Sequence, residues 1–335
     1  MPGPRNPIVN AGCTANIDAP AVEIAMPAYN CAPWLDDFMH SLLDQDFAAW
    51  RLLARDDRSS DDTNHRLLGW QSRLGRRMAV LPDSGVRNLG VIGNYNAVFA
   101  ATSARWVMSA DPDDVWLPGK ISRTLAAMRQ AEDSLAADTP VAICTDAQVV
   151  DGDRRPLAPS FWRWSHMNPS LMRKPRRVAM ESVALGSTMM VNRALLDVAL
   201  PIESQAAYQD WWLALVAAAF GHVGTLDATT ILYRRHGCNA TSDPYGHTLF
   251  GVLRRTLASP GAPRRRLEKV LAPAAVQAAA FVTRYGARLN GRDAAALRSL
   301  AKLPTLGPIQ RRLAVLRHGL WFASASKNVA LFVLV

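Results

Sequence analysis

Residues 106–116, with the sequence WVMSADPDDVW, place three aspartates within four residues directly after an apolar run. The run itself, residues 106–109, is typical of a buried strand. The three like charges repel one another, and a carboxylate that is buried without a partner is costly. A solvated acidic turn is one explanation. The other is a divalent cation, since Mg²⁺ usually binds one or two carboxylates together with substrate phosphates.

Around this stretch, apolar strand-like runs alternate with segments of helical periodicity. Such alternation predicts βαβ units and an α/β fold with a mostly parallel sheet flanked by helices. The predicted strands are residues 22–26 (ended by Pro27), 52–54, 78–81, 106–109, 141–144, 223–226 and 231–233. The predicted helices are residues 34–43, 63–74, 93–101, 119–130, 192–199 and 209–220. From about residue 247 the pattern is wholly helical and rich in alanine and basic residues.

Polar side chains follow several of the predicted strands. Asn30, Asp57 and Asp111 each lie just past a strand end. In parallel sheets ligands bind outside the carboxyl ends of the strands. We therefore expect these three residues to converge on one crevice.

The four cysteines are widely scattered without metal-ligand spacing, which fits a reducing compartment and gives no disulfide framework. Residues 1–20 lack the apolar core of a secretory signal and are predicted to be a flexible leader. No run of apolar residues is long enough for a transmembrane helix. These features predict a cytoplasmic protein.

The net charge of +10 is concentrated in the C-terminal part of the chain. Residues 251–335 contain 15 Lys and Arg but only 2 Asp and Glu. Nucleic acid, an anionic membrane surface or a solvated helical face could each explain this imbalance. Residues 310–335 mix basic with aromatic and aliphatic side chains, which favours a helix lying on a membrane. Packing against the rest of the chain or against a homodimer partner is the alternative.

Six motifs in order carry a resemblance to a known family. They are MPAYN (26–30), DDRSSDDT (56–63), NLGV (88–91), DPDDVW (111–116), QDWW (209–212) and YRRHGCN (233–239). This set resembles family 2 glycosyltransferases of the GT-A, Rossmann-like fold, and most of all their rhamnosyltransferase-like branch. The resemblance covers about residues 21–242. It implies a GT-A domain over residues 21–246, followed by a helical basic region over residues 247–335.

The resemblance implies a set of residues that bind the nucleotide sugar. These are Ala28, Tyr29, Asn30, Asp57, Asn88, Gly90 and Asp111. From its chemistry, Asp57 can accept a hydrogen bond from the N3–H of uracil or thymine, or can instead cap the helix ahead. Asn88 and Gly90 could equally form an ordinary loop. The family usually has glycine where this chain has Arg58.

The resemblance also implies a Mg²⁺ or Mn²⁺ site. Asp113 is the predicted ligand across the diphosphate, and Asp114 is a further candidate. His236 resembles the histidine that completes the metal site in many members, although a lone histidine is often structural. Arg234 and Arg235 could instead offset phosphate charge, because guanidinium matches phosphate well.

Asp210 is the predicted general base. Direct displacement at an anomeric carbon needs an acceptor hydroxyl that loses its proton, and a partly desolvated carboxylate suits this task. One base and one displacement imply inversion. Trp211 and Trp212 could form an apolar wall and an acceptor-stacking surface, or could be core residues next to a helix start. Trp162, in the irregular FWRW segment, could shape the acceptor site or fold onto the core.

Together these features predict an inverting, metal-dependent glycosyltransferase. It would move a sugar, L-rhamnose from dTDP-rhamnose by resemblance, onto a cell-surface polysaccharide or lipid-linked glycan. Hexose, galactofuranose and N-acetylhexosamine donors remain open. The predicted location is the inner face of the cytoplasmic membrane, with a possible homodimer and no nucleic acid partner. A non-catalytic sugar-nucleotide-binding scaffold protein is the alternative.

Overall fold

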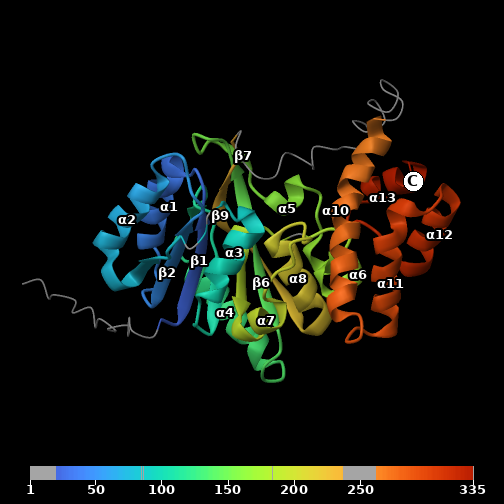
Figure 1. Cartoon of the computed structure of the whole chain (residues 1–335), viewed down its shortest axis with the longest axis horizontal. Coiled ribbons are helices and arrows are strands. Elements are labelled where there is room, and N and C mark those ends of the chain that lie inside the picture. Colours follow the sequence, from blue (N-terminus) through green and yellow to red (C-terminus); the bar gives the residue numbers. More distant parts are fainter. Residues whose placement is uncertain (1–19, 84, 86, 183, 237–261, 335) are drawn as a thin grey trace, which may run out of the picture.

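A computed structural model describes residues 20–83, 85, 87–182, 184–236 and 262–334 (Figure 1). The predicted leader therefore lies outside the described residues except for Pro20. So do Gly237, Cys238 and Asn239 at the end of the YRRHGCN motif.

One mixed sheet forms the centre of the molecule, with the strand order β3-β2-β1-β4-β8-β6-β9-β5, and β7 pairs with β6 at its side. The strands are β1 (Val22–Ala28), β2 (Trp50–Asp56), β3 (Met78–Val80), β4 (Trp106–Ser109), β5 (Val115–Trp116), β6 (Val141–Val150), β7 (Pro156–Ala158), β8 (Met189–Asn192) and β9 (His222–Arg234). The ladders of β1 with β2 and β4, of β2 with β3, and of β6 with β9 are parallel. The α/β prediction with a mostly parallel sheet is confirmed.

Helices cover this sheet and extend beyond it. The helices of the sheet region are α1 (Ala32–Leu43), α2 (Thr63–Leu74), α3 (Gly90–Ala100), α4 (Lys120–Asp133), α5 (Phe161–Trp164), α6 (Pro175–Val178), α7 (Arg193–Ala199) and α8 (Gln209–Phe220). The C-terminal helices are α10 (Ala262–Tyr285), α11 (Gly291–Lys302), α12 (Pro308–His318) and α13 (Ala325–Leu334). Figure 1 shows these last four side by side at the end of the molecule opposite α1 and α2.

Several strand predictions were wrong in their bounds, and β2 and β6 are both longer than predicted. Strand β1 continues through Pro27 to Ala28. Pro27 has no backbone N–H to donate to a neighbouring strand. It is tolerated because β4 pairs with β1 only as far as Ala25, so on that side no strand lies beside Pro27. The two predicted closing strands are one strand, β9, and register shifts around Asp146 of β6 let the single long ladder form.

The C-terminal helices pack directly behind helix α8. The ring of Trp212 lies 5.4 Å from that of Phe281 and 6.0 Å from that of Tyr285. The side chain of Gln277 accepts a hydrogen bond of 3.0 Å from the backbone N–H of Ala207, just before α8. Helix α10 therefore supports the helix that begins at the QDWW motif.

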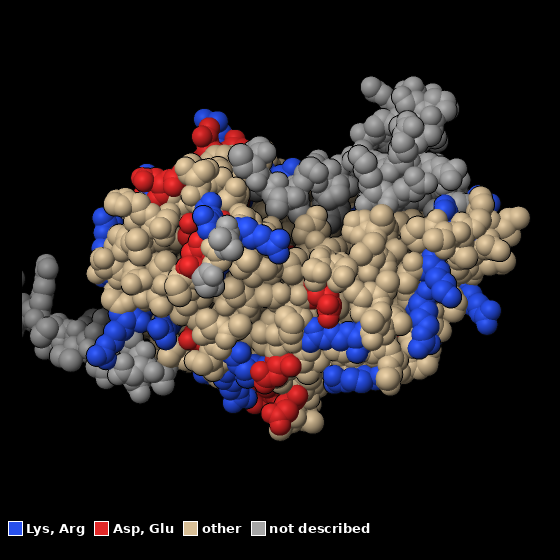
Figure 2. Space-filling view, in the orientation of Figure 1, with Lys and Arg blue, Asp and Glu red and all other residues tan. Residues whose placement is uncertain are grey.

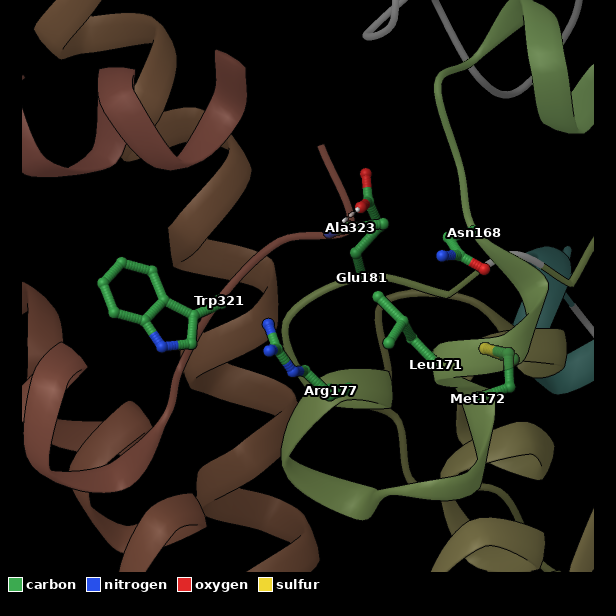
Figure 3. Close-up of a pocket in the computed structure, with 7 residues that line it drawn as sticks. All are labelled: Asn168, Leu171, Met172, Arg177, Glu181, Trp321 and Ala323. Carbon is green, nitrogen blue, oxygen red and sulfur yellow. Dashed lines mark hydrogen bonds between the residues drawn. The ribbon is translucent and has the colours of Figure 1, made fainter. Parts of the chain in front are cut away.

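A second contact between the C-terminal chain and the sheet region borders a small pocket (Figure 3). Glu181 accepts a hydrogen bond from the backbone N–H of Ala323 at 3.2 Å and pairs with Lys327. Figure 3 shows Trp321 on one side of this seam and Leu171 and Met172 on the other. The contact fixes the segment between α12 and α13 against the chain around α6.

The length and apolar character of the helices bear on membrane spanning. Within residues 20–236 and 262–334, apart from the three single positions left out, no helix is long and apolar enough to cross a bilayer.

Candidate active site

The loops after β1 and β2 meet at the carboxyl end of the sheet, as predicted. The backbone N–H of Asp57 donates to the carbonyl oxygen of Ala28 at 2.9 Å. The side chain of Asn30 accepts from the backbone N–H of Ser60 at 2.8 Å. Tyr29 between them is 54% exposed, so its ring is free to pack against a ligand.

The backbone conformation at Arg58 is one that favours glycine, the residue that is usual at this position in the family that the sequence resembles. Its φ is +66°, a left-handed conformation that glycine adopts without strain. The guanidinium of Arg58 donates to the carbonyl oxygen of Gly85 at 2.8 Å and lies 3.5 Å from the carboxylate of Asp83. These contacts hold the strained residue in place and tie the two loops together.

The carboxylate of Asp57 is occupied by protein donors. It accepts hydrogen bonds from Arg55 at 2.9 Å, from the backbone N–H of Leu89 at 3.0 Å and from the backbone N–H of Gly90 at 2.9 Å. Asn88 adds a bond from its side chain to the carbonyl oxygen of Asp57 at 2.8 Å. Asp57 is only 2% exposed. With these bonds the Asp57 carboxylate orders the Asn88–Gly90 turn. Direct contact between Asp57 and a nucleotide base stays a prediction, and it requires this turn to open.

Removing the Asp57 carboxylate should therefore destabilise the fold. The Asp57→Ala change leaves the buried Arg55 with Asn94 and a longer contact to Asp83, so we expect the free energy of unfolding to fall by about 3 kcal/mol. Urea unfolding measures this. The matched control is Asp62→Ala, because that carboxylate is 67% exposed and its ion pair with Arg66 is 3.9 Å long. Equal stability of the two variants would show that Asp57 does not organise the turn.

The acidic stretch after β4 lies against a short loop from a distant part of the chain. Asp111 accepts a hydrogen bond of 2.7 Å from the hydroxyl of Tyr95 and another from the backbone N–H of Ser187. Burial and the charge of Asp113 raise the pKa of Asp111 to about 6, against the lowering effect of these bonds. The accumulated negative charge here is what a divalent cation would neutralise.

Asp113 and His236 form a pair that could hold a metal ion. Their nearest side-chain atoms, Oδ2 and Nε2, are 2.9 Å apart, and the His236 ring stacks on Trp34 with centroids 3.9 Å apart. Both side chains are partly exposed, at 23% and 10%. Among the described residues no three His, Cys, Asp or Glu side chains gather as a complete metal site. The pair fits a cation that takes its remaining ligands from substrate phosphates and water.

Asp114 does not fit the predicted metal-ligand role in this arrangement. It is 1% exposed, and its two oxygens accept from the Ser187 hydroxyl at 2.5 Å and the backbone N–H of Arg234 at 3.0 Å. Burial and the charge of Asp113 raise its pKa well above the usual value. Because both carboxylate oxygens of Asp114 accept hydrogen bonds from the protein, this residue links the acidic stretch to β9 and to the Ser187 loop.

Asp210 stands in the first turn of α8, where it is partly buried. Its Oδ1 accepts from the backbone N–H of Trp211 at 2.6 Å. Burial raises the pKa of Asp210 to about 7, and the charge of Asp111 adds to the shift, whereas backbone bonds from Trp211 and Gly186 oppose it. A carboxylate with this pKa can take a proton near neutral pH.

The loop of Gly186 and Ser187 was missed by sequence reasoning, although it donates hydrogen bonds to Asp111, Asp114 and Asp210. A Cβ atom on Gly186 would lie 2.7 Å from Nε2 of Gln209, 3.5 Å from the carboxylate of Asp111 and 3.6 Å from the hydroxyl of Tyr95. A residue with a Cβ atom here would have to push the end of the Gln209 side chain aside. In the sequence, Gly-Ser-Thr between two apolar runs resembles any turn, so no local signal marks it.

The three predicted acceptor-stacking tryptophans are buried. Trp212 is fully buried against α10, Trp211 is 9% exposed with its indole N–H donating to the carbonyl oxygen of Val178, and Trp162 is 4% exposed. The stacking prediction is therefore wrong for Trp212, which is a core residue. Trp211 and Trp162 likewise present little surface to a ligand in this structure. Their large rings are used in packing, which aligns α8 and α5 beside the site.

The two arginines of the YRRH motif have different surroundings. Arg234 is 4% exposed and donates to Asp37 at 2.7 Å and to the carbonyl oxygens of Asp113 and Gly152. Arg234 therefore has a structural role, because its bonds hold the acidic stretch in position. The guanidinium of Arg235 lies over the ring of Trp164, 5.4 Å from its centroid, and the side chain is partly exposed.

Comparison with known proteins shows the family of the chain. A model described as "Glycosyl transferase family 2" matches residues 23–198, which is more than half of the chain. The chain belongs to glycosyl transferase family 2. This membership confirms the family part of the resemblance, and the rhamnosyltransferase-like branch stays a prediction.

A curated relative is the UDP-Glc:alpha-D-GlcNAc-diphosphoundecaprenol beta-1,3-glucosyltransferase WfgD of Escherichia coli, with 31% identity over 107 residues. The match covers 32% of this chain, and it spans only 40% of the length of WfgD.

Two solved structures share the fold of this family 2 member. One is S. aureus TarS 1–349 in complex with UDP-GlcNAc, at TM-score 0.52 and 14% identity over 88% of this chain and 79% of TarS. The other is the mannosyltransferase PcManGT from Pyrobaculum calidifontis in complex with GDP-Man and Mn²⁺, at TM-score 0.50 and 15% identity over 94% of this chain and 86% of that one. At these identities the likeness concerns the GT-A fold alone.

Proposed function

We propose that this family 2 protein is an inverting glycosyltransferase that uses a nucleotide-sugar donor. The observation that carries the proposal is the arrangement of carboxylates around the Gly186–Ser187 loop. Asp111, close enough to Asp113 to feel its charge, accepts a bond from Ser187, and Asp210, with a pKa of about 7, accepts one from Gly186. A phosphate-binding end next to a base of matched pKa is what direct sugar transfer requires.

In this proposal Asp210 is the general base. Its carboxylate takes the proton of the acceptor hydroxyl as the oxygen attacks the anomeric carbon, and the bond from that carbon to the diphosphate breaks. Helix α8 fixes the position of the carboxylate, since the opposite face of the helix packs on Phe281 and Tyr285. A single displacement inverts the anomeric configuration.

Asp113 and His236 are the proposed metal ligands. A bound Mg²⁺ or Mn²⁺ would neutralise charge on the donor diphosphate. The stacking of His236 on Trp34 and its contact with Asp113 keep both groups oriented toward the same point. The PcManGT complex contains GDP-Man and Mn²⁺, which supports the proposal of a divalent metal.

The nucleotide end is proposed to lie over Ala28, Tyr29 and Asn30. Tyr29 is the exposed side chain there and can cover a base, whereas Asp57 and Asn88 hold the adjoining turn. Arg235, held over Trp164, is the proposed cation for phosphate oxygens in place of the buried Arg234.

The proposed donor is dTDP-rhamnose, which supplies L-rhamnose, because the six motifs resemble the rhamnosyltransferase-like branch. The acceptor is proposed to be a cell-surface glycan or a lipid-linked precursor. The name of WfgD, whose substrate is a diphosphoundecaprenol-linked sugar, supports the acceptor class.

A donor screen tests the function. Purified full-length protein is incubated with UDP-, GDP- and dTDP-sugars and with Mg²⁺, Mn²⁺ or EDTA, and release of nucleoside diphosphate is followed. We expect release from one base class, faster with metal than with EDTA. Binding of a sugar nucleotide without any turnover, also with added lipid-linked acceptors, would favour the scaffold alternative.

A further inference from the structure

Helix α12 carries a stripe of exposed aliphatic side chains. Ile309 is 72% exposed, Leu313 59% and Leu316 55%. Their spacing of four and three residues puts them on one face of the helix. Single exposed aliphatic residues are ordinary on protein surfaces, whereas a contiguous row indicates an interaction site. We name Ile309, Leu313 and Leu316 the α12 stripe.

The opposite face of α12 attaches the helix to the protein. Val315 is 1% exposed, and the guanidinium of Arg311 donates to the carbonyl oxygens of Leu303 and Pro304. The stripe therefore faces away from the molecule. Its exposure is not the result of a loose helix end.

Two arginines border the stripe. At about 100° per residue, Arg312 lies about 60° to one side of the stripe and Arg317 about 80° to the other. Arg317 is exposed, and Arg312 is partly exposed with one bond to the carbonyl oxygen of Phe332. An aliphatic row with a guanidinium on each side matches a helix that lies in a lipid headgroup layer.

The surroundings carry an excess of positive charge. Residues 291–334 contain seven Lys and Arg and a single acidic residue, Asp293, which pairs with Arg176 at 3.4 Å. In the view of Figure 2, basic side chains and no acidic ones are visible at the end of the molecule where Figure 1 draws α11 and α12. The stripe is thus set in a surface that attracts anions.

We propose that α12 docks the protein on an anionic lipid membrane. The α12 stripe enters the interface between headgroups and acyl chains, and Arg312 and Arg317 contact the lipid phosphates. A second copy fits this face less well, because in a two-fold dimer the same patch meets itself and would bring the basic surroundings together. The inference does not depend on the proposed enzymatic activity.

Vesicle sedimentation tests the proposal with the full-length protein. The probes are vesicles of phosphatidylcholine alone and of phosphatidylcholine mixed with phosphatidylglycerol. We expect binding to the anionic vesicles, weakened by added salt. The Ile309→Ser, Leu313→Ser, Leu316→Ser variant should bind at least about tenfold more weakly. Arg317→Gln should weaken binding a few-fold, and only to the anionic vesicles.

The matched control is Leu68→Ser with Leu157→Ser, since these side chains are 48% and 56% exposed on α2 and β7. The control should bind as the wild type does. Leu313→Glu alone provides a second variant, which should repel anionic vesicles. Wild-type binding by the triple-serine and Leu313→Glu variants would overturn the proposal. So would a wild-type dimer that the triple-serine change converts to a monomer without altering vesicle binding.

Discussion

Replacing Asp210 by Asn should lower kcat for sugar transfer by about a thousandfold. Asparagine keeps the size of the side chain but cannot take the proton of the acceptor hydroxyl. The KM for the donor should change little, because Asp210 is proposed to contact the acceptor. Steady-state kinetics measure both constants. Asp197→Asn on the neighbouring α7 is the control, since that carboxylate is exposed.

The same substitution should make the protein more stable above neutral pH. The pKa of Asp210 is raised from 3.8 to about 7 in the folded protein, so the folded state binds more protons than the unfolded state between these values. The free energy of unfolding of the wild type therefore falls as the pH rises from about 4 to about 7. Asp210→Asn lacks this loss and should be more stable at about pH 8, by on the order of 2 kcal/mol.

Thermal unfolding at about pH 4 and about pH 8 measures this difference. At the lower pH the two proteins should differ little in stability, because Asp210 is protonated in the folded state and already partly protonated in the unfolded state. An inactive Asp210→Asn protein that is less stable than the wild type at about pH 8 would mean that Asp210 is a structural residue. The pH profile of wild-type kcat should rise toward a plateau above about pH 7.

Replacing Asp113 by Asn should lower kcat/KM for the donor by at least about a hundredfold. The change removes a charged ligand from the Asp113–His236 pair while leaving an oxygen in the same place. Raising the Mn²⁺ concentration should restore part of the activity, since the cation still has His236 and the donor phosphates.

A titration of Mn²⁺ against initial rate checks this second prediction. Asp153→Asn is the control, because Asp153 is 72% exposed and pairs only with Arg155 in the described contacts. Equal metal dependence of the wild type and Asp113→Asn would remove Asp113 from the metal site.

Much of the architecture could be predicted because local pattern and tertiary structure agree. Helices α2 and α8 and strand β4 have the predicted bounds, since amphipathic or apolar runs end there at clear turn residues. Strand β8 was missed because its four residues run straight into a helix that the same apolar stretch continues. Its place beside β4 depends on antiparallel pairing that no periodicity reveals.

The candidate site was predictable where chemistry needs charged residues in short motifs. The predictions for Asp111, Asp113, Asp210 and His236 were made in this way, and their roles stay predictions. The state of each carboxylate could not, because it depends on partners distant in the sequence. Asp57 and Asp114 have the same residue type as Asp113, yet loops at residues 88–90 and 186–187 occupy their oxygens. Likewise the burial of Trp212 follows from α10, which begins 50 residues later.

The anomeric configuration of the first-formed product tests the central claim most directly. The donor identified by the screen is incubated with the wild-type protein and acceptor, or with water as acceptor, and the reaction is followed by proton NMR. A single displacement assisted by Asp210 predicts a product with the configuration opposite to that of the donor. A first-formed product that keeps the donor configuration would contradict the account, because retention requires a second displacement or a front-face reaction for which Asp210 is not the base.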